Sequence, residues 1–245
     1  MLKYEQIAQK INIFIEEGHF QAGDKLPSVE TLKEQYQVSK STVIKALEVL
    51  EKRGFIYQAQ GSGIYVRNKQ REGYLNLFST GGFSDEIVGL EVTNKVLKVE
   101  EVIPPESVQQ KLKLKGEVSV YLLERIVYVN GDILCYEKSY FNKDIVLFLN
   151  ESIAEHSIFN YLEQHLKVKI GFSDIYFTVD KLNAWDAEKL ELVEGDPCLN
   201  YEQVFYTTTG IPFDCSHLHY HYQNAYFYIP FAKIKCLCYE LYSMY

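Results

Sequence analysis

Hydroxyl and basic side chains gather in one short stretch of the chain, from Ser39 to Lys45. If Ser39 caps a helix, then Lys40, Ser41 and Thr42 occupy its first turn and Lys45 follows one turn later. Free backbone N–H groups and short side chains at a helix start allow close approach to phosphate oxygens and to base edges. The stretch therefore predicts a surface that contacts nucleic acid.

A second set of reactive side chains, Cys215, His217, His219 and His221, alternates along an expected strand and so shares one face of it. Thiolate and imidazole groups are ligands of zinc and copper. Alternate residues of a strand are about 6.5–7 Å apart, however, which is long for four ligands of one ion. We therefore expect no metal site, and we keep a metal-responsive regulator as an alternative.

The elements that must position the first set come early in the chain. Apolar residues recur at helical spacing and predict three helices, over 3–17, from Pro27-Ser28 onward and over 40–53. Gly54 ends the third helix, and two alternating segments then flank Gly61-Ser62-Gly63. Three helices followed by a glycine-tipped hairpin predict a winged helix-turn-helix, whose third helix enters a DNA major groove.

Charge is distributed unevenly along the 245 residues, whose formal net charge is −8. Residues 1–70 hold ten Lys/Arg and eight Asp/Glu, a balance of +2, so the rest of the chain carries −10. A basic DNA-binding part on an acidic body fits this asymmetry. The odd number of cysteines, five, and the absence of a C-x-x-C pair favour reduced thiols.

Several segments of the first 66 residues resemble the DNA-binding domain of the GntR family of bacterial transcription regulators. They are G-D-K-L-P-S at 23–28, V-S-K-S-T-V at 38–43, K-A-L-E-x-L at 45–50 and Q-G-S-G-x-x-V at 60–66. Two family arginines are replaced, by Glu30 and by Ile44. Glu30 on the DNA side repels phosphate or accepts a hydrogen bond from a cytosine amino group. The residues expected to bind DNA are Glu30, Ser39, Lys40, Ser41, Thr42, Lys45, Gly61 and Ser62.

Strand patterns dominate after a polar linker placed at 69–78, and the second domain is placed at 79–245. Asn130-Gly131 predicts a tight hairpin between strands at 118–129 and 133–141. Further strands are expected at 96–103, 172–179, 199–207, 213–222 and 226–231. Short helices are expected at 105–112, 157–166 and 184–192. The fold class is thus α+β, an N-terminal winged helix-turn-helix followed by an antiparallel sheet with a few helices.

The order of these elements resembles UTRA, the effector-binding domain of the HutC-type GntR branch, whose fold is like chorismate lyase. The matching segments are E-R-I at 124–126, Y-E-K-S-Y at 136–140, H-S-I at 156–158 and I-P-F-D at 211–214. By that resemblance the effector site consists of Phe83, Ser84, Arg125, Glu137, Ser157, Asp214 and Tyr220. Positions 214, 216, 218 and 220 share one strand face, which supports the last two.

Two features of this site bear on the ligand. Arg125 is expected to clamp an anionic group, assisted by Ser157 at a helix start. Val127 replaces the second arginine of the family's R-x-R pair, which makes a carboxylate or a less charged sugar or amino compound more plausible than a phosphosugar. The alternative is that Arg125 and Glu137 form a purely structural cross-strand ion pair.

Together these features predict a sequence-specific transcription regulator, a repressor controlled by a small anionic, sugar-type or amino-type metabolite. We expect a homodimer, because two recognition helices match two half-sites about 34 Å apart on DNA. No run of about 18 apolar residues occurs, so we expect a cytoplasmic protein without a membrane partner. No cofactor is expected. An enzyme on a chorismate-lyase-like body is the second alternative, resting only on fold analogy.

Overall fold

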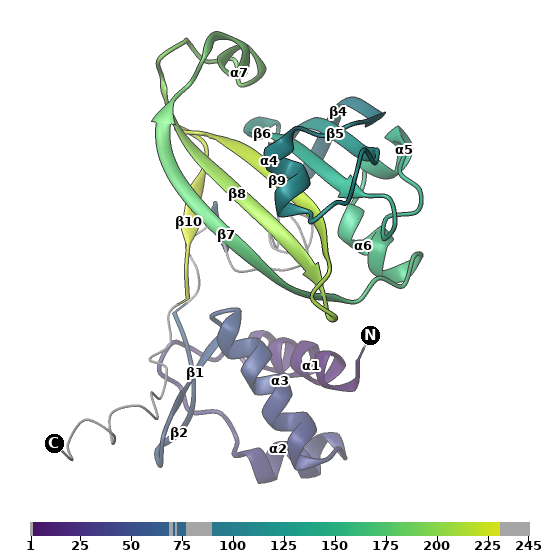
Figure 1. The fold of residues 1–245 in the computed structure, drawn as a ribbon. Coiled ribbons are helices and arrows are strands. Elements are labelled where there is room, and N and C mark those ends of the chain that lie inside the picture. The colour runs from purple at the N-terminus through teal and green to yellow at the C-terminus, as the bar shows by residue number, and fades with distance from the viewer. Residues whose placement is uncertain (1, 69–70, 72, 77–89, 231–245) are drawn as a thin grey trace, which may run out of the picture. The chain divides into compact units, whose positions relative to one another are not determined.

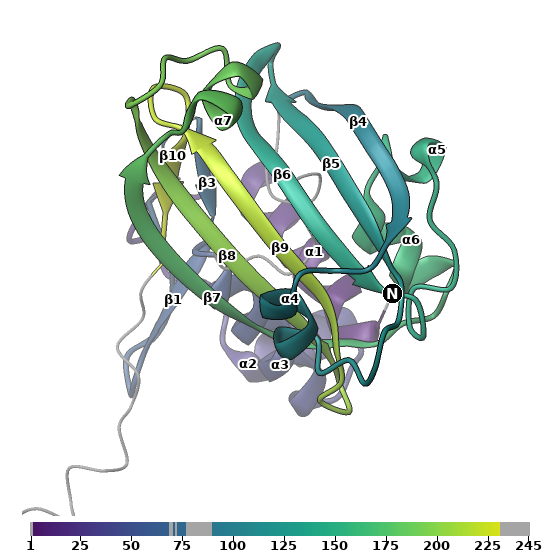
Figure 2. The ribbon, with the colours of Figure 1, turned by 45° about the horizontal axis from the view of Figure 1, so that its top comes forward.

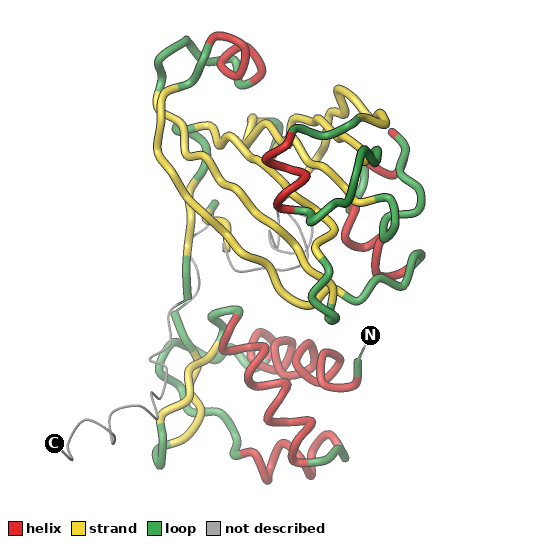
Figure 3. The backbone as a smooth tube through the Cα atoms, in the orientation of Figure 1, coloured by secondary structure: helices red, strands yellow, loops and turns green. Residues whose placement is uncertain are grey.

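The computed structural model describes residues 2–68, 71, 73–76 and 90–230 (Figure 1). The chain divides into two compact units. The first, the head unit, comprises residues 1–78 and 227–245. The second, the sheet unit, comprises residues 79–226. Figure 3 shows that helix dominates the described part of the head unit and strand dominates the sheet unit.

Three helices and a hairpin form the head unit: α1 (Lys3–Glu17), α2 (Val29–Tyr36), α3 (Lys40–Lys52), β1 (Ile56–Ala59) and β2 (Gly63–Val66). Its core gathers the apolar stripes of the helices, including Ile11, Leu32 and Leu47, none of which is exposed. Helix α2 ends at Gln37, which adopts the left-handed conformation. Ser39 then caps α3. The predicted winged helix-turn-helix is confirmed.

A second two-stranded ribbon is formed by β3 (Tyr74–Asn76) and β10 (Tyr226–Tyr228), whose last two residues belong to the head unit. The ring of Tyr228 lies under the Arg67 guanidinium, 6.0 Å from it. Gly54, with a φ of +79°, has no room for a side chain, because a Cβ there would lie 2.9 Å from Pro230 Cβ. The segment that sequence analysis presents as a linker thus contains a strand, paired with a strand about 150 positions later.

The sheet unit is built on a six-stranded antiparallel sheet in the order β4-β5-β6-β9-β8-β7 (Figure 2). The strands are β4 (Val92–Val102), β5 (Val120–Val129), β6 (Asp132–Asn142), β7 (Ile170–Lys181), β8 (Pro197–Thr207) and β9 (Pro212–His221). The turn between β5 and β6 has positive φ at both Asn130 and Gly131, as a two-residue hairpin requires. All of these strands are predicted from the sequence, with shifted ends.

Helices cover the two faces of this sheet. On one face, α5 (Glu151–Ala154) and α6 (Ile158–Gln164) pack over an apolar cluster that includes Leu123 and Phe141. On the other face, α4 (Glu106–Lys111) packs near Tyr140 and Cys215, and α7 (Ala184–Lys189) packs near Tyr136. Helix α5 has only four residues and is absent from the sequence predictions. The last predicted strand, 226–231, is present as the shorter β10, and residues 231–245 lie outside the described residues.

Candidate functional site

The start of helix α3 presents the predicted nucleic-acid surface. Ser39 Oγ accepts from the Thr42 backbone N–H at 3.2 Å and lies 2.8 Å from Thr42 Oγ1. Ser41 joins the same cluster, with its Oγ 2.9 Å from that of Ser39. Ser41 and Lys45 are exposed, while Thr42 is half-buried. The capping network therefore fixes the hydroxyls at the helix start and leaves Ser41 and Lys45 facing solvent.

Glu30 is held within the head unit by two lysines. Its carboxylate lies 2.8 Å from Lys40 Nζ and 3.3 Å from Lys33 Nζ. Hydrogen bonds from Lys40 and then Lys33 lower the pKa of Glu30. The sequence predicts Glu30 and Lys40 as separate DNA contacts, whereas the structure joins them in an ion pair. Because Lys40 already has a carboxylate partner, a DNA phosphate must compete with Glu30 for it.

The wing between β1 and β2 adds a second candidate surface. Gly61, at its tip, has a φ of +74°, a conformation that favours glycine. Ser62 Oγ lies 2.6 Å from Tyr65 Oη, which stiffens the turn. Lys25 lies alongside, bridged to Tyr65 in an isolated antiparallel pair with its ammonium 5.9 Å from the Tyr65 ring. Lys25 is a candidate contact that sequence analysis misses, because only the folded pairing brings it to the wing.

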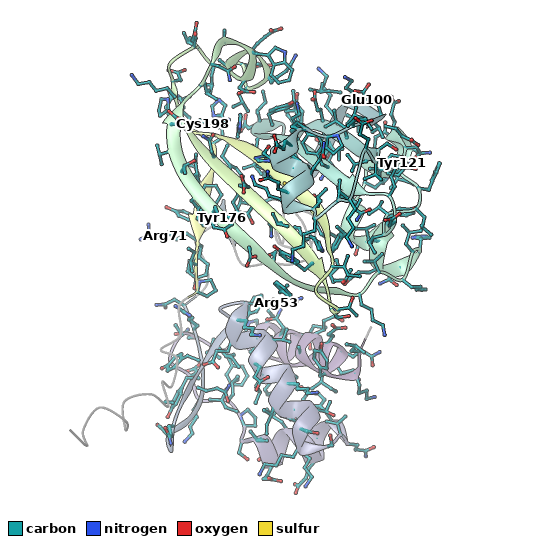
Figure 4. All side chains as sticks on the ribbon, viewed as in Figure 1. Arg53, Arg71, Glu100, Tyr121, Tyr176 and Cys198 are labelled. Atoms are coloured by element: carbon teal, nitrogen blue, oxygen red, sulfur yellow. The ribbon has the colours of Figure 1, made fainter. Side chains whose placement is uncertain are left out.

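The sheet unit carries a stripe of buried polar side chains on the face that α5 and α6 cover. Such groups are rare inside a sheet unless they bind something or one another. Among the described residues, eleven polar or charged side chains are buried, and six of them share this stripe. We call them the polar stripe: Arg125, Glu137, Ser139, Gln203, Asp214 and Ser216. Figure 4 draws the side chains of this unit, with Tyr121 marking β5 and Cys198 the start of β8.

Arg125 donates three hydrogen bonds within the sheet unit. Its Nε donates to Glu137 Oε2 at 2.7 Å, and both side chains are more than nine-tenths buried. Its Nη1 donates to the carbonyl oxygens of Ala154 at 3.0 Å and His156 at 3.4 Å. The structural ion pair is thus present, and it neutralises the cation that sequence analysis assigns to an anionic ligand.

The connection between α5 and α6 is anchored to the same region. Asn94 Nδ2 donates to the Glu155 carbonyl oxygen at 3.1 Å, while Asn94 Oδ1 is buried with no hydrogen-bond partner in the structure. Ser157 caps α6 by accepting from the Asn160 backbone N–H at 3.3 Å. Its hydroxyl oxygen is therefore engaged in the cap, as the predicted helix start requires, while its proton remains available to donate. Asn94 is absent from the sequence predictions, since it lies on β4 outside every motif.

Ser139 and Ser216 connect the carboxyl groups of Glu137 and Asp214 within the polar stripe. Ser139 donates to Glu137 Oε1 at 2.7 Å and lies 2.7 Å from Ser216 Oγ. Ser216 Oγ in turn lies 2.7 Å from Asp214 Oδ1. Burial raises the pKa of Asp214 well above its usual range, despite the opposing hydrogen bond to Ser216. Neither serine is among the predicted site residues, although strand parity places Ser216 between Asp214 and Tyr220.

The remaining predicted effector residues divide into two groups. Tyr220 is buried on the stripe's face, opposite Cys135 on β6 and Leu199 on β8. Phe83 and Ser84 lie outside the described residues. The structure therefore brings Arg125, Glu137, Asp214 and Tyr220 to one face, as predicted, with Ser157 on the helix that covers it.

The cysteine and histidines of β9 lie on the opposite face, as strand parity predicts. Cys215 is buried in the cluster beneath α4. His217 Nδ1 lies 3.7 Å from Glu202 and His219 Nδ1 lies 3.3 Å from Asp186. Burial lowers the pKa of His217, which favours its neutral form. Within the described ranges no three His, Cys, Asp or Glu side chains are placed to hold one metal ion.

Comparisons with known proteins agree with this arrangement. The family model for bacterial regulatory proteins of the gntR family matches residues 3–66, and the model for the UTRA domain matches residues 88–225. The uncharacterised HTH-type transcriptional regulator YydK of Bacillus subtilis strain 168 is 45% identical over 94% of this chain and 97% of its own. A crystal structure of YydK, 44% identical, has a TM-score of 0.80 and covers 94% of this chain and 99% of that one.

A more distant relative carries a functional name. The mannosyl-D-glycerate transport/metabolism system repressor MngR of Escherichia coli strain K12 is 28% identical over 70% of this chain and 71% of its own. YydK is named as a transcriptional regulator and MngR as a repressor, which is consistent with a protein that is not an enzyme. No described helix is long and apolar enough to cross a membrane. The chain belongs to the gntR family of bacterial transcription regulators and carries a UTRA domain C-terminal to its DNA-binding domain.

Proposed function

We propose that this regulator is a repressor that binds an operator through α3 and the wing, and that a small metabolite at the polar stripe controls it. The observation that carries the proposal is the stripe itself, six buried polar side chains in a sheet face that would otherwise be apolar core. Small-molecule sites are lined mostly by apolar side chains, with a few polar groups that orient the ligand, and the stripe supplies such groups among the apolar residues of this face. The repressor role is supported by the name of the relative MngR.

The charge balance of the stripe favours a metabolite that is polar but carries no strong negative charge. Arg125 is already neutralised by Glu137 at 2.7 Å. Val127, two residues on, is apolar and fully buried. An anion would have to displace Glu137 from Arg125, at the cost of a buried unpaired carboxylate. A ligand hydroxyl or amino group instead finds an acceptor beside the stripe, the unpartnered Oδ1 of Asn94, which is paired with Val127 across the strands.

Ligand binding regulates DNA binding if it favours one of two relative positions of the two DNA-binding domains in a dimer. We propose a cytoplasmic homodimer, whose two α3 helices engage half-sites about 34 Å apart. The ligand then shifts the population between a state that fits this spacing and one that does not. This requires different ligand affinities in the two states.

A release assay tests the proposal. A labelled operator duplex bound to the protein is titrated with pairs of compounds, each pair a neutral sugar or polyol and its phosphate ester. We expect the neutral compound of one pair to release the protein from the duplex. In Ser216→Ala, which removes the hydroxyl between Ser139 and Asp214, this release should be lost. The matched control is Thr178→Ala on the opposite face of exposed strand β7, which should respond like the wild type. Stronger release by the phosphate ester would contradict the proposed ligand class.

A further inference from the structure

A chain of four oxygen-bearing side chains crosses the polar stripe and contains one more contact than its hydroxyl protons can supply. Glu137, Ser139, Ser216 and Asp214 are joined by three oxygen–oxygen contacts, each 2.7 Å long. Each serine hydroxyl has a single proton to donate. Two protons cannot occupy three contacts, and two oxygens at this distance without a proton between them repel each other. The third proton must therefore come from one of the two carboxyl groups.

The surroundings of the two carboxyl groups decide which one holds it. Glu137 accepts from the Arg125 guanidinium, whose positive charge stabilises the ionised form. Asp214 has no cation in direct contact in the structure, and its cross-strand neighbours are Phe141 on β6 and Phe205 on β8. Asp214 is only 1% exposed to solvent. An unpaired carboxylate so deeply buried is far more costly than a neutral carboxyl.

We propose that Asp214 is protonated at neutral pH and donates to Ser216, which donates to Ser139, which donates to Glu137. In this order every contact holds one proton and every donor has one acceptor. The charges that face Asp214 are Glu137 from β6 and Arg125 from β5, and they cancel as an ion pair. The stripe then has no net charge, and Asp214 acts as a positioning residue.

The functional consequence deepens the effector-binding role proposed above and rests on it. The hydrogen-bonded serines hold the Glu137 carboxylate in place, and this carboxylate accepts a hydrogen bond from Arg125. Arg125 in turn donates to the carbonyl oxygens of Ala154 and His156, just before Ser157. A proton on Asp214 thus sets the geometry of the α5–α6 connection. It also selects an uncharged, hydroxyl-bearing ligand, because a neutral stripe offers no free cation to an anion.

The pH dependence has a definite sign. Burial raises the pKa of Asp214 in the folded protein above its unfolded value of about 3.9. The folded state then holds more protons between these two pKa values, so stability falls as pH rises through this window. The unfolding equilibrium constant of wild type relative to Asp214→Asn should rise by up to about tenfold per pH unit there. Asparagine keeps a donor towards Ser216 but has no proton to lose.

The experiment combines infrared spectroscopy with urea unfolding of the full chain, and no effector is needed. Unfolding is followed by the fluorescence of Trp185, which is the only tryptophan and lies in the sheet unit. At pH 7 we expect a protonated-carboxyl band in the wild type that is missing in Asp214→Asn, and the relative pH slope given above. No such band, with a flat relative stability above pH 4, would overturn the proposal.

Two further measurements keep the result interpretable. Asp214→Ala removes the donor altogether and should be less stable than Asp214→Asn at every pH; if it does not fold, the asparagine variant alone still decides. Operator binding is measured on the same samples. A carboxyl band without operator binding would refute the regulatory role and leave the proton in place, whereas operator binding without the band would refute the proton alone.

Discussion

Removing the Arg125 guanidinium is expected to destabilise the sheet unit strongly. Arg125→Met leaves Glu137 as a buried carboxylate without its cation, since both side chains are more than nine-tenths buried and joined at 2.7 Å. Breaking a buried ion pair in this way costs about 3–5 kcal/mol. In Arg125→Met/Glu137→Gln the charge is gone, and only the Ala154 and His156 carbonyl oxygens lose a donor, at about 1–3 kcal/mol. The double variant should therefore be more stable than the single one.

Urea unfolding at pH 7 measures this double-mutant cycle, with Trp185 fluorescence reporting on the sheet unit. The matched control is the exposed pair Lys98–Glu100, whose charges are also 2.7 Å apart but lie in solvent. Its cycle should show a much smaller coupling, because water screens exposed pairs. If Arg125→Met costs less than about 1 kcal/mol, the pair is not the buried, mutually neutralised unit described here. Arg125 would then be free to bind an anionic effector.

Three further outcomes follow from the head unit. Gly54→Ala should destabilise it by at least about 1–2 kcal/mol, because a side chain at φ +79° is strained and meets Pro230 and Tyr228; thermal unfolding followed by circular dichroism tests this. Ser39→Ala should cost about 1 kcal/mol in the same assay through loss of the α3 cap, and no loss would contradict the capping geometry. Glu30→Gln should tighten operator binding in fluorescence anisotropy, since it frees Lys40 for phosphate; weaker binding would mean that Glu30 itself reads a base.

Local sequence signals predict the elements of this protein well, because each depends on neighbouring residues. Ser39 caps its helix, Asn130-Gly131 makes its turn, and alternation along β9 assigns Asp214 and Cys215 to opposite faces. These features need only periodicity and turn chemistry.

Features that depend on distant residues are not visible in the sequence. Strand β3 has three residues, and its partner β10 begins 150 positions after its last residue, so no local pattern marks it. Ser139 and Ser216 become part of the site only because β6 and β9 are adjacent in the sheet. The Glu30–Lys40 ion pair likewise depends on the angle between α2 and α3.

Operator binding by the full chain is the measurement on which the assignment as a DNA-binding regulator depends. A labelled duplex from the region upstream of its own gene is titrated at two salt concentrations, with scrambled duplex as competitor. We expect tight, sequence-selective binding whose log affinity falls linearly with log salt, because cations at α3 and the wing displace counterions from phosphates. Binding no tighter than to the scrambled duplex, or an affinity independent of salt, would contradict it.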